Sequence, residues 1–288
     1  MSSPVATQPR PDAPPFSVET ILGRASSENF PVALRVLGRE TRMHLLAIYG
    51  FARLVDQIGD AAPGNRIELL DRLEEDLDRA FAGHARDPLL QTLGATVHAL
   101  DLPRAPFERL IEANRRDQVQ SRYPTFVDLL DYCRLSANPV GELVLHVFGQ
   151  ATVERVALSD SVCTALQLIE HWQDVGEDAR AGRVYLPQED LDRFGVRDDD
   201  LTAAAVTEPL RRLLAFEVAR AQALLDEGAP LVRLVRGRAR LALAGFVGGG
   251  RAAADALVRA QYEVLAASPR PGRRRRARAV ARALRGAS

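Results

Sequence analysis

The stretch "QLIEHWQDVGEDARAGRVYLPQEDLDRFGV" (167–196) decides the fold of this chain and much of its chemistry. Apolar residues recur in its first half at spacings of three and four, which is typical of a helix. Four polar residues follow steps of three, four and four, so they share one face of that helix: Gln167, Glu170, Asp174 and Asp178. Like charges four residues apart repel each other. A row of acids among core-type residues is therefore either a solvated helix surface or part of a site for a cation.

An earlier stretch, "IYGFARLVDQIGD" (48–60), repeats the arrangement. Its polar residues follow steps of four, three and four among apolar neighbours: Tyr49, Arg53, Asp56 and Asp60. Either acidic face alone is compatible with a solvated helix surface. Two such faces in one chain favour a shared cavity, where five carboxylates would need a counter-charge. Mg²⁺ can supply it, because it binds one or two carboxylates and completes its octahedron with water and substrate phosphates.

The residues after the second acidic face suit a diphosphate ligand. Arg183 follows Gly182, and together with Arg53 of the first face it can donate hydrogen bonds to diphosphate oxygens. Metal ions and arginines around a diphosphate can ionise an allylic carbon–oxygen bond, because they stabilise the charge that develops on the leaving group. The cation left behind needs a dry apolar cavity, which a helical bundle can enclose.

Composition favours one large soluble or peripheral domain. The chain has 288 residues, of which 47% are hydrophobic, so it can bury a large core. Basic and acidic residues number 38 each, so no nucleic-acid partner is expected. Cys133 and Cys163 form no CxxC motif, which indicates a reducing, cytoplasmic compartment. The apolar run 241–250 is too short to span a membrane.

The chain divides into a lead-in, a domain and a tail. Residues 1–17 predict a disordered lead-in without a signal peptide, residues 18–268 an all-α domain, and residues 269–288 a basic tail. The cluster "RRRRAR" (273–278) is either a solvated, frayed tail or a site of attraction to an anionic surface, such as the periphery of the inner membrane. Helices are predicted near residues 19–25, 30–37, 40–59, 66–82, 87–100, 105–119, 125–148, 159–179, 207–226, 231–247, 250–266 and 273–285.

Four stretches resemble the squalene and phytoene synthases, the head-to-head branch of the all-α isoprenoid synthases. They are 48–60, 167–196, "ENFPVALRVL" (28–37) and "LLDYCRLSANPVGELVL" (129–145). The resemblance implies an all-α, single-domain isoprenoid synthase bundle with a central apolar cavity. The pieces "ENFPV" and "YCRLSANPVG" further resemble one subgroup, the hydroxysqualene synthases of bacterial hopanoid pathways.

The resemblance also implies roles for individual residues. The expected metal ligands are Asp56, Asp60, Glu170, Asp174 and Asp178. The expected substrate-binding residues are Asn29, Tyr49, Arg53, Gln167, Gln173, Arg183 and Tyr185. Tyr132 is expected to handle a proton or to stabilise a cation. By contrast, Asp117 is interpreted as a solvated acid at a helix end, and His171 as a structural residue.

One departure from the family pattern bears on the product. Phytoene-type relatives have Y-C-x-x-V-A-G-x-V-G where this chain has "YCRLSANPVG" (132–141). Pro139 removes a helix hydrogen bond and should kink the predicted helix. Asn138 stands where glycine is usual. It either caps the broken turn or, with Ser136, positions the water that quenches the cation.

The resemblance implies an Mg²⁺-dependent lyase that ionises presqualene diphosphate and lets water capture the rearranged cation, giving hydroxysqualene and diphosphate. Two alternatives stay open. The chain could instead condense two farnesyl diphosphates head to head, or it could be a non-catalytic assembly subunit, against which the two intact acidic faces argue. NAD(P)H is not expected, because "FVGGG" (246–250) lacks the spacing and the preceding strand of a nucleotide site. Further candidate partners are the membrane periphery and other enzymes of the pathway.

Overall fold

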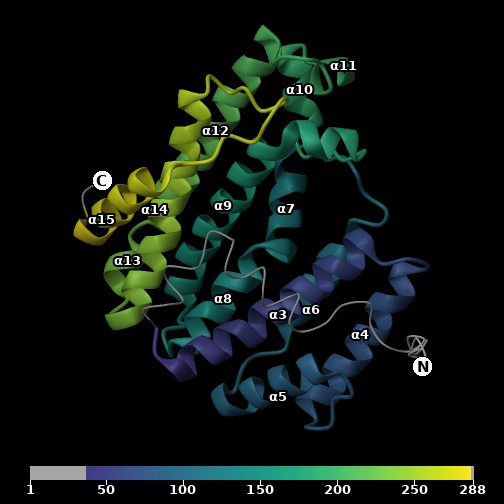
Figure 1. The fold of residues 1–288 in the computed structure, drawn as a ribbon, viewed down its shortest axis with the longest axis vertical. Coiled ribbons are helices and arrows are strands. Elements are labelled where there is room, and N and C mark those ends of the chain that lie inside the picture. The colour runs from purple at the N-terminus through teal and green to yellow at the C-terminus, as the bar shows by residue number, and fades with distance from the viewer. Residues whose placement is uncertain (1–36, 287–288) are drawn as a thin grey trace, which may run out of the picture.

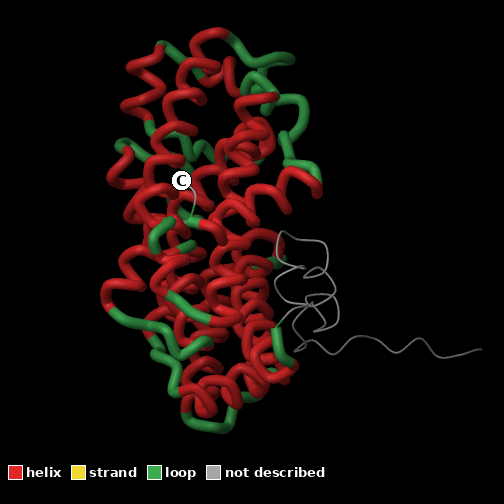
Figure 2. Tube along the Cα trace, turned by 90° about the vertical axis from the view of Figure 1, so that its left-hand side faces the viewer, coloured by secondary structure: helices red, strands yellow, loops and turns green. Residues whose placement is uncertain are grey.

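The computed structural model describes residues 37–286, and this part of the chain forms helices and no strand (Figure 1, Figure 2), which confirms the all-α fold class. Asn29, the lead-in and the helices predicted near 19–25 and 30–37 lie outside the described residues. The helices are α3 (Arg39–Ala61), α4 (Arg66–Phe81), α5 (Pro88–Leu100), α6 (Ala105–Arg116), α7 (Phe126–Ser136), α8 (Asn138–Val147), α9 (Val153–Arg180), α10 (Gln188–Phe194), α11 (Asp198–Leu201), α12 (Glu208–Gly228), α13 (Leu231–Leu234), α14 (Gly237–Arg259) and α15 (Arg273–Arg285).

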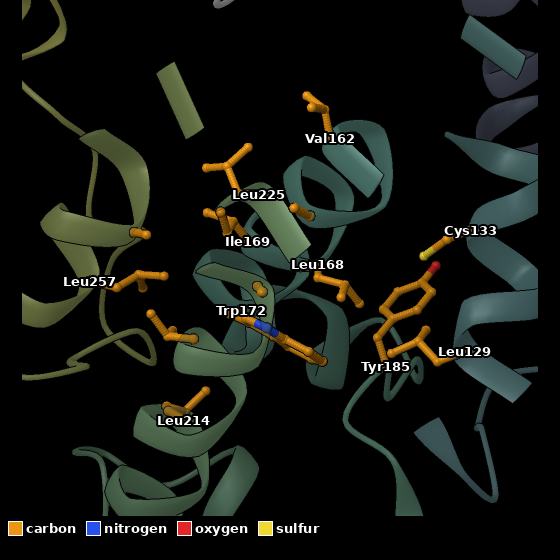
Figure 3. Close-up of a cluster of buried hydrophobic side chains, with 14 of the residues drawn as sticks. Leu129, Cys133, Val162, Leu168, Ile169, Trp172, Tyr185, Leu214, Leu225 and Leu257 are labelled. Atoms are coloured by element: carbon orange, nitrogen blue, oxygen red, sulfur yellow. The ribbon is translucent and has the colours of Figure 1, made fainter. Parts of the chain in front are cut away.

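Helix α9 carries the second acidic face and lies between α12 and α14 on one side and α7 on the other (Figure 1). It begins at Val153, earlier than predicted, because the Thr152 side chain accepts a hydrogen bond from the N–H of Arg155. Trp172 of α9 is fully buried, and Figure 3 shows it in one hydrophobic cluster with Leu214 of α12. The apolar residues of α9 therefore hold the helix in the core, and its acidic residues lie outside this hydrophobic cluster.

Helix α3 carries the first acidic face and packs its other side on α4, α5 and α6. Phe51 of α3 and Phe107 of α6 meet edge to face with their ring centres 5.3 Å apart, and both are fully buried. Arg53, Asp56 and Asp60 lie outside this hydrophobic cluster. The packing of α3 thus fixes the direction in which its acids point.

The helix predicted over 125–148 is broken into α7 and α8. The break falls at Ala137, and Pro139 occupies the first turn of α8, where its missing N–H leaves no helix hydrogen bond unmade. The predicted kink is therefore confirmed, in the stronger form of a complete break. The short helices α10 and α11 were not predicted.

The helices predicted over 231–247 and 250–266 are wrong. The chain breaks at Val235 and Arg236 instead, and Gly248, Gly249 and Gly250 lie inside α14. A Cβ atom at Gly248 would lie only 2.5 Å from the backbone nitrogen of Val280 in α15. This glycine therefore serves close helix packing and does not break the helix.

Helix α15 confirms the helix predicted near 273–285, so this segment is not frayed. Ala283 is buried, and Val280 and Leu284 pack against the same hydrophobic cluster as α14. Within the described residues, α14 is the one helix that is long and apolar enough to cross a membrane, and 56% of its apolar window is buried inside the protein.

Candidate active site

A cavity of about 530 Å³ lies between α3, α6, α7, α8, α9 and α14. All the predicted metal ligands line it: Asp56, Asp60, Glu170, Asp174 and Asp178. So do seven other predicted site residues: Tyr49, Arg53, Gln167, Arg183, Tyr185, Tyr132 and Ser136. The two acidic faces therefore share one space, as expected. That these side chains bind metal or substrate stays a prediction.

The cavity changes character along its length. Five of its six acids come from the C-terminal halves of α3 and α9, and the sixth, Asp117, follows α6. The other halves of these helices contribute mainly apolar side chains, and α14 adds more; the apolar set includes Leu45, Ile48, Val162, Leu166, Ala242, Leu243, Phe246 and Val247. One end of the cavity is therefore acidic, and the other end is lined by hydrocarbon.

Arg183 reaches the acidic end from the turn after α9. Gly182 has a φ of +80°, a left-handed conformation that side chains disfavour, and this turn lets the N–H of Arg183 donate to the Asp178 carbonyl at 2.9 Å. The Arg183 guanidinium donates to the Asp60 carboxylate at 2.7 Å. A single arginine thus joins the end of the second acidic helix to the first.

The acids of the cavity carry more negative charge than nearby arginines balance. Arg53 donates to Tyr49 Oη at 3.3 Å and to Asp56 at 3.4 Å. Burial nevertheless raises the pKa of Asp56 to about 6. Burial, and then repulsion by Asp174, raise the pKa of Asp178 to about 7. A raised carboxyl pKa means that the ionised form is poorly stabilised, so a bound cation would be favoured here.

The acids fit a magnesium ion that is shared with its ligand. Among residues 37–286, no group of three or more His, Cys, Asp or Glu side chains could hold a metal ion by itself. Mg²⁺ does not require such a group, because it keeps several waters and often binds one or two carboxylates plus substrate phosphates. Carboxylates on both walls of the cavity, with raised pKa values at Asp56 and Asp178, suit Mg²⁺ bound together with a diphosphate.

Asp117 is part of the cavity wall, and its interpretation as a solvated acid is wrong. The Tyr132 hydroxyl donates to Asp117 Oδ2 at 2.8 Å, and both residues line the cavity. Burial raises the pKa of Asp117 to about 6, although this hydrogen bond opposes the rise. Burial and neighbouring Tyr185 raise the pKa of Tyr132 well above its ordinary value, so the phenol stays protonated. The spacing of residues in the sequence could not predict this pair, because the contact depends on how α6 packs against α7.

An aromatic stack supports the wall next to these residues. Tyr185 stacks on His171 with ring centres 3.6 Å apart, and the rings of Tyr123 and Tyr132 lie 5.7 and 5.8 Å from it. Burial lowers the pKa of His171 to about 3, so the imidazole is neutral. His171 Nε2 also lies 3.1 Å from Gln167 Nε2. The contacts of His171 are those of a residue that positions its neighbours.

Two predicted site residues do not reach the cavity. Asn138 is buried, and its Oδ1 accepts a hydrogen bond from Thr164 Oγ1 at 2.9 Å, so its amide ties the broken turn to α9. No side chain makes a capping hydrogen bond at the start of α8, so the predicted capping role of Asn138 is not observed either. Ser136, in contrast, lines the cavity, and its buried Oγ has no partner among the described residues.

Gln173 belongs to a strap formed by residues 264–269, which crosses the acidic end of α9. Its amide donates to the Pro269 carbonyl, and Asp174 accepts a hydrogen bond from Ser268 Oγ. The Arg180 guanidinium donates to the carbonyl of Leu265. The predicted role of Gln173 in substrate binding is therefore not supported, because its side chain faces this strap and does not line the cavity.

Comparisons with known proteins agree with this geometry. A sequence model of squalene/phytoene synthases matches residues 23–282. The chain is 36% identical over 218 residues to a hydroxysqualene synthase of Sinorhizobium fredii, covering 73% of this chain and 72% of that protein. It is also 36% identical over 217 residues to phytoene synthase 3 of Zea mays, but covers only 51% of that longer protein and 72% of itself. The crystal structure of squalene synthase HpnC from Alicyclobacillus acidocaldarius shares 47% identity and a TM-score of 0.79, over 84% of this chain and 92% of that one. The predicted isoprenoid synthase bundle is thereby confirmed.

Proposed function

The chain belongs to the squalene/phytoene synthase family, whose members are enzymes that act on prenyl diphosphates, and from this premise we propose that it converts presqualene diphosphate and water into hydroxysqualene and diphosphate. One observation carries the proposal: a single cavity has six acids and two arginines at one end and hydrocarbon at the other. A diphosphate with a long hydrocarbon substituent matches this division.

The acidic end would hold the leaving group. Arg53 and Arg183 can donate hydrogen bonds to diphosphate oxygens, and Arg183 would exchange its bond with Asp60 for one with the substrate. Mg²⁺, held by Asp56, Asp60, Glu170, Asp174 and Asp178, would neutralise the charge that the diphosphate gains when the carbon–oxygen bond breaks and the electron pair leaves with it.

The apolar end would protect the carbocation. Side chains such as Leu243 and Phe246 exclude bulk water from this part of the cavity, so the cation can rearrange before it is quenched. Ser136 has a free hydroxyl on the wall, which can orient one water molecule toward the cation.

The proton of the captured water needs an acceptor. When water oxygen bonds to the cationic carbon, one proton must leave to give the alcohol. Tyr132 donates to Asp117, so a proton can pass to the Tyr132 oxygen as the phenol proton moves to Asp117. Asp117, with a pKa of about 6, is mostly ionised at neutral pH and can accept it.

A second function has its own support. The identity to a phytoene synthase is as high as the identity to a hydroxysqualene synthase, 36% in both cases. Head-to-head condensation of two farnesyl diphosphates to presqualene diphosphate or a phytoene-like product would use the same acids and the same apolar wall. Asn138 no longer distinguishes the two reactions, because its side chain is engaged with Thr164.

Purified protein should be given presqualene diphosphate or farnesyl diphosphate, each with Mg²⁺, and the products identified by mass spectrometry. The proposal expects hydroxysqualene and diphosphate from presqualene diphosphate. Consumption of farnesyl diphosphate alone would favour the condensing enzyme. Absence of diphosphate release from both substrates would favour the non-catalytic subunit, and release that EDTA abolishes would exclude it.

A further inference from the structure

The charge of this chain is divided unevenly along the sequence. The whole chain has 38 basic residues, all arginine, and 38 acidic residues. Residues 228–288 contain 14 of the arginines and only two acids, Asp255 and Glu263. Residues 1–227 therefore contain 24 arginines and 36 acids. The zero net charge hides a strongly basic C-terminal segment attached to an acidic remainder.

Helix α15 presents part of this charge to solvent. Its apolar side packs against α14 through Ala283 and Val280. On the opposite side, exposed arginines follow steps of four, four and three: Arg274, Arg278, Arg282 and Arg285. None of these four forms an ion pair with an acid in the described part of the chain. Their charges are therefore available to an external partner.

The start of α14 extends the same surface. Arg240 donates to the carbonyl of Leu284 at 2.7 Å, and a Cβ atom at Gly286 would lie 3.6 Å from Arg233 Cδ. Figure 1 shows α13, α14 and α15 together on one side of the molecule. We call the combined surface the basic face; its exposed arginines are Arg233, Arg236, Arg238, Arg240, Arg274, Arg278, Arg282 and Arg285.

The basic face lies on the helices that close the apolar end of the cavity. Leu231 of α13 and Ala242, Leu243 and Phe246 of α14 line the cavity from inside, within a few turns of the exposed arginines. Most of the acids at the other end come from the C-terminal halves of α3 and α9. Positive charge outside and hydrocarbon inside thus occur at the same end of the molecule.

We infer that the basic face docks the protein on an anionic lipid bilayer, with the apolar end of the cavity turned toward the membrane. Arginine binds lipid phosphates bidentately, and clusters of basic residues are attracted to anionic headgroups. The apolar residues of α15 are used in packing on α14, so the contact is electrostatic and does not need insertion of this helix. A role in exchanging hydrocarbon with the bilayer rests on the proposed function, whereas docking itself does not.

The test is flotation of the full-length protein with vesicles. Vesicles of phosphatidylcholine are compared with vesicles that also contain phosphatidylglycerol, at low and high salt. The variant R274Q/R278Q is compared with R72Q/R134Q, whose arginines are each 67% exposed and paired with an acid on their own helix, outside residues 228–288. Glutamine preserves helix propensity, and circular dichroism checks that each variant is folded.

The inference expects binding to the phosphatidylglycerol vesicles that disappears with salt. Each lost arginine should weaken binding about fivefold, so R274Q/R278Q should bind roughly 25-fold more weakly, while R72Q/R134Q should match the wild type. Equal binding to both vesicle types, binding to duplex DNA without binding to vesicles, or unchanged binding of R274Q/R278Q would overturn it. Vesicle binding by a protein that turns over no prenyl diphosphate would support docking and reject only the proposed function.

Discussion

Replacement of Arg183 by glutamine should lower catalysis far more than stability. The ion pair between Arg183 and Asp60 is 2.7 Å long, but the two side chains are 31% and 53% exposed. A pair exposed to this extent contributes at most about 1 kcal/mol to folding, which corresponds to a loss of about 2–4 °C in Tm for a chain of this size. In the reaction, however, Arg183 would stabilise charge on the departing diphosphate, and loss of one such donor lowers kcat by about 10²- to 10³-fold.

The assay is diphosphate release at saturating Mg²⁺ and presqualene diphosphate, with thermal unfolding measured on the same samples. The matched control is R122Q, because Arg122 and Asp198 also form a 2.7 Å pair, 42% and 70% exposed, and neither residue lines the cavity. The control should show a similar small loss of Tm and a normal kcat. A kcat of R183Q close to that of the wild type, or an equal fall in R122Q, would refute the assignment of Arg183 to the leaving group.

Three further predictions concern Tyr132, Asn138 and Asp178. Tyr132→Phe removes the hydrogen bond to Asp117 and should lower kcat on the order of 10²-fold with little change in KM; steady-state kinetics with an unchanged kcat would contradict the proton path. Asn138→Ala should lower the unfolding free energy by about 1–3 kcal/mol in urea titrations, because Thr164 loses its acceptor, and should leave the product unchanged; a lower yield of alcohol would return Asn138 to the water-positioning role. Metal-free protein should become less stable as the pH rises from about 4 to 7. Folding raises the pKa of Asp178 from 3.8 to about 7, so in this range the folded state holds a proton that the unfolded chain has released. Thermal unfolding measured across this range would contradict the account if stability rose, and Mg²⁺ with diphosphate should weaken the fall by replacing the proton.

The sequence predicted those parts of the site that depend on helix periodicity. Asp56 and Asp60, like Asp174 and Asp178, are four residues apart, so any helix places each pair on one face. Apolar neighbours such as Phe51 then decide which side is buried and therefore which way the acids point. For this reason the shared cavity could be predicted without knowledge of the tertiary structure.

Residues whose surroundings come from distant segments could not be predicted in this way. The place of Asp117 depends on Tyr132 of a different helix, and the place of Asn138 depends on Thr164 of α9. The break predicted between residues 247 and 250 is wrong, because the sequence does not reveal that α15 packs closely over Gly248. In each case the local sequence was compatible with both an exposed and a buried position, and contacts with distant segments determine which of the two occurs.

The strap of residues 264–269 has a practical consequence for work on this protein. A chain shortened before Val264 would retain all six cavity acids but would lose Ser268, the hydrogen-bond partner of Asp174, and the backbone that covers Gly176. Truncation that removes this strap together with the arginine-rich helix α15 would therefore disturb the acidic end of α9 as well. Removal of surface charge should be done by point substitution, so that an effect on vesicle binding is not confused with a change at the acidic end of the cavity.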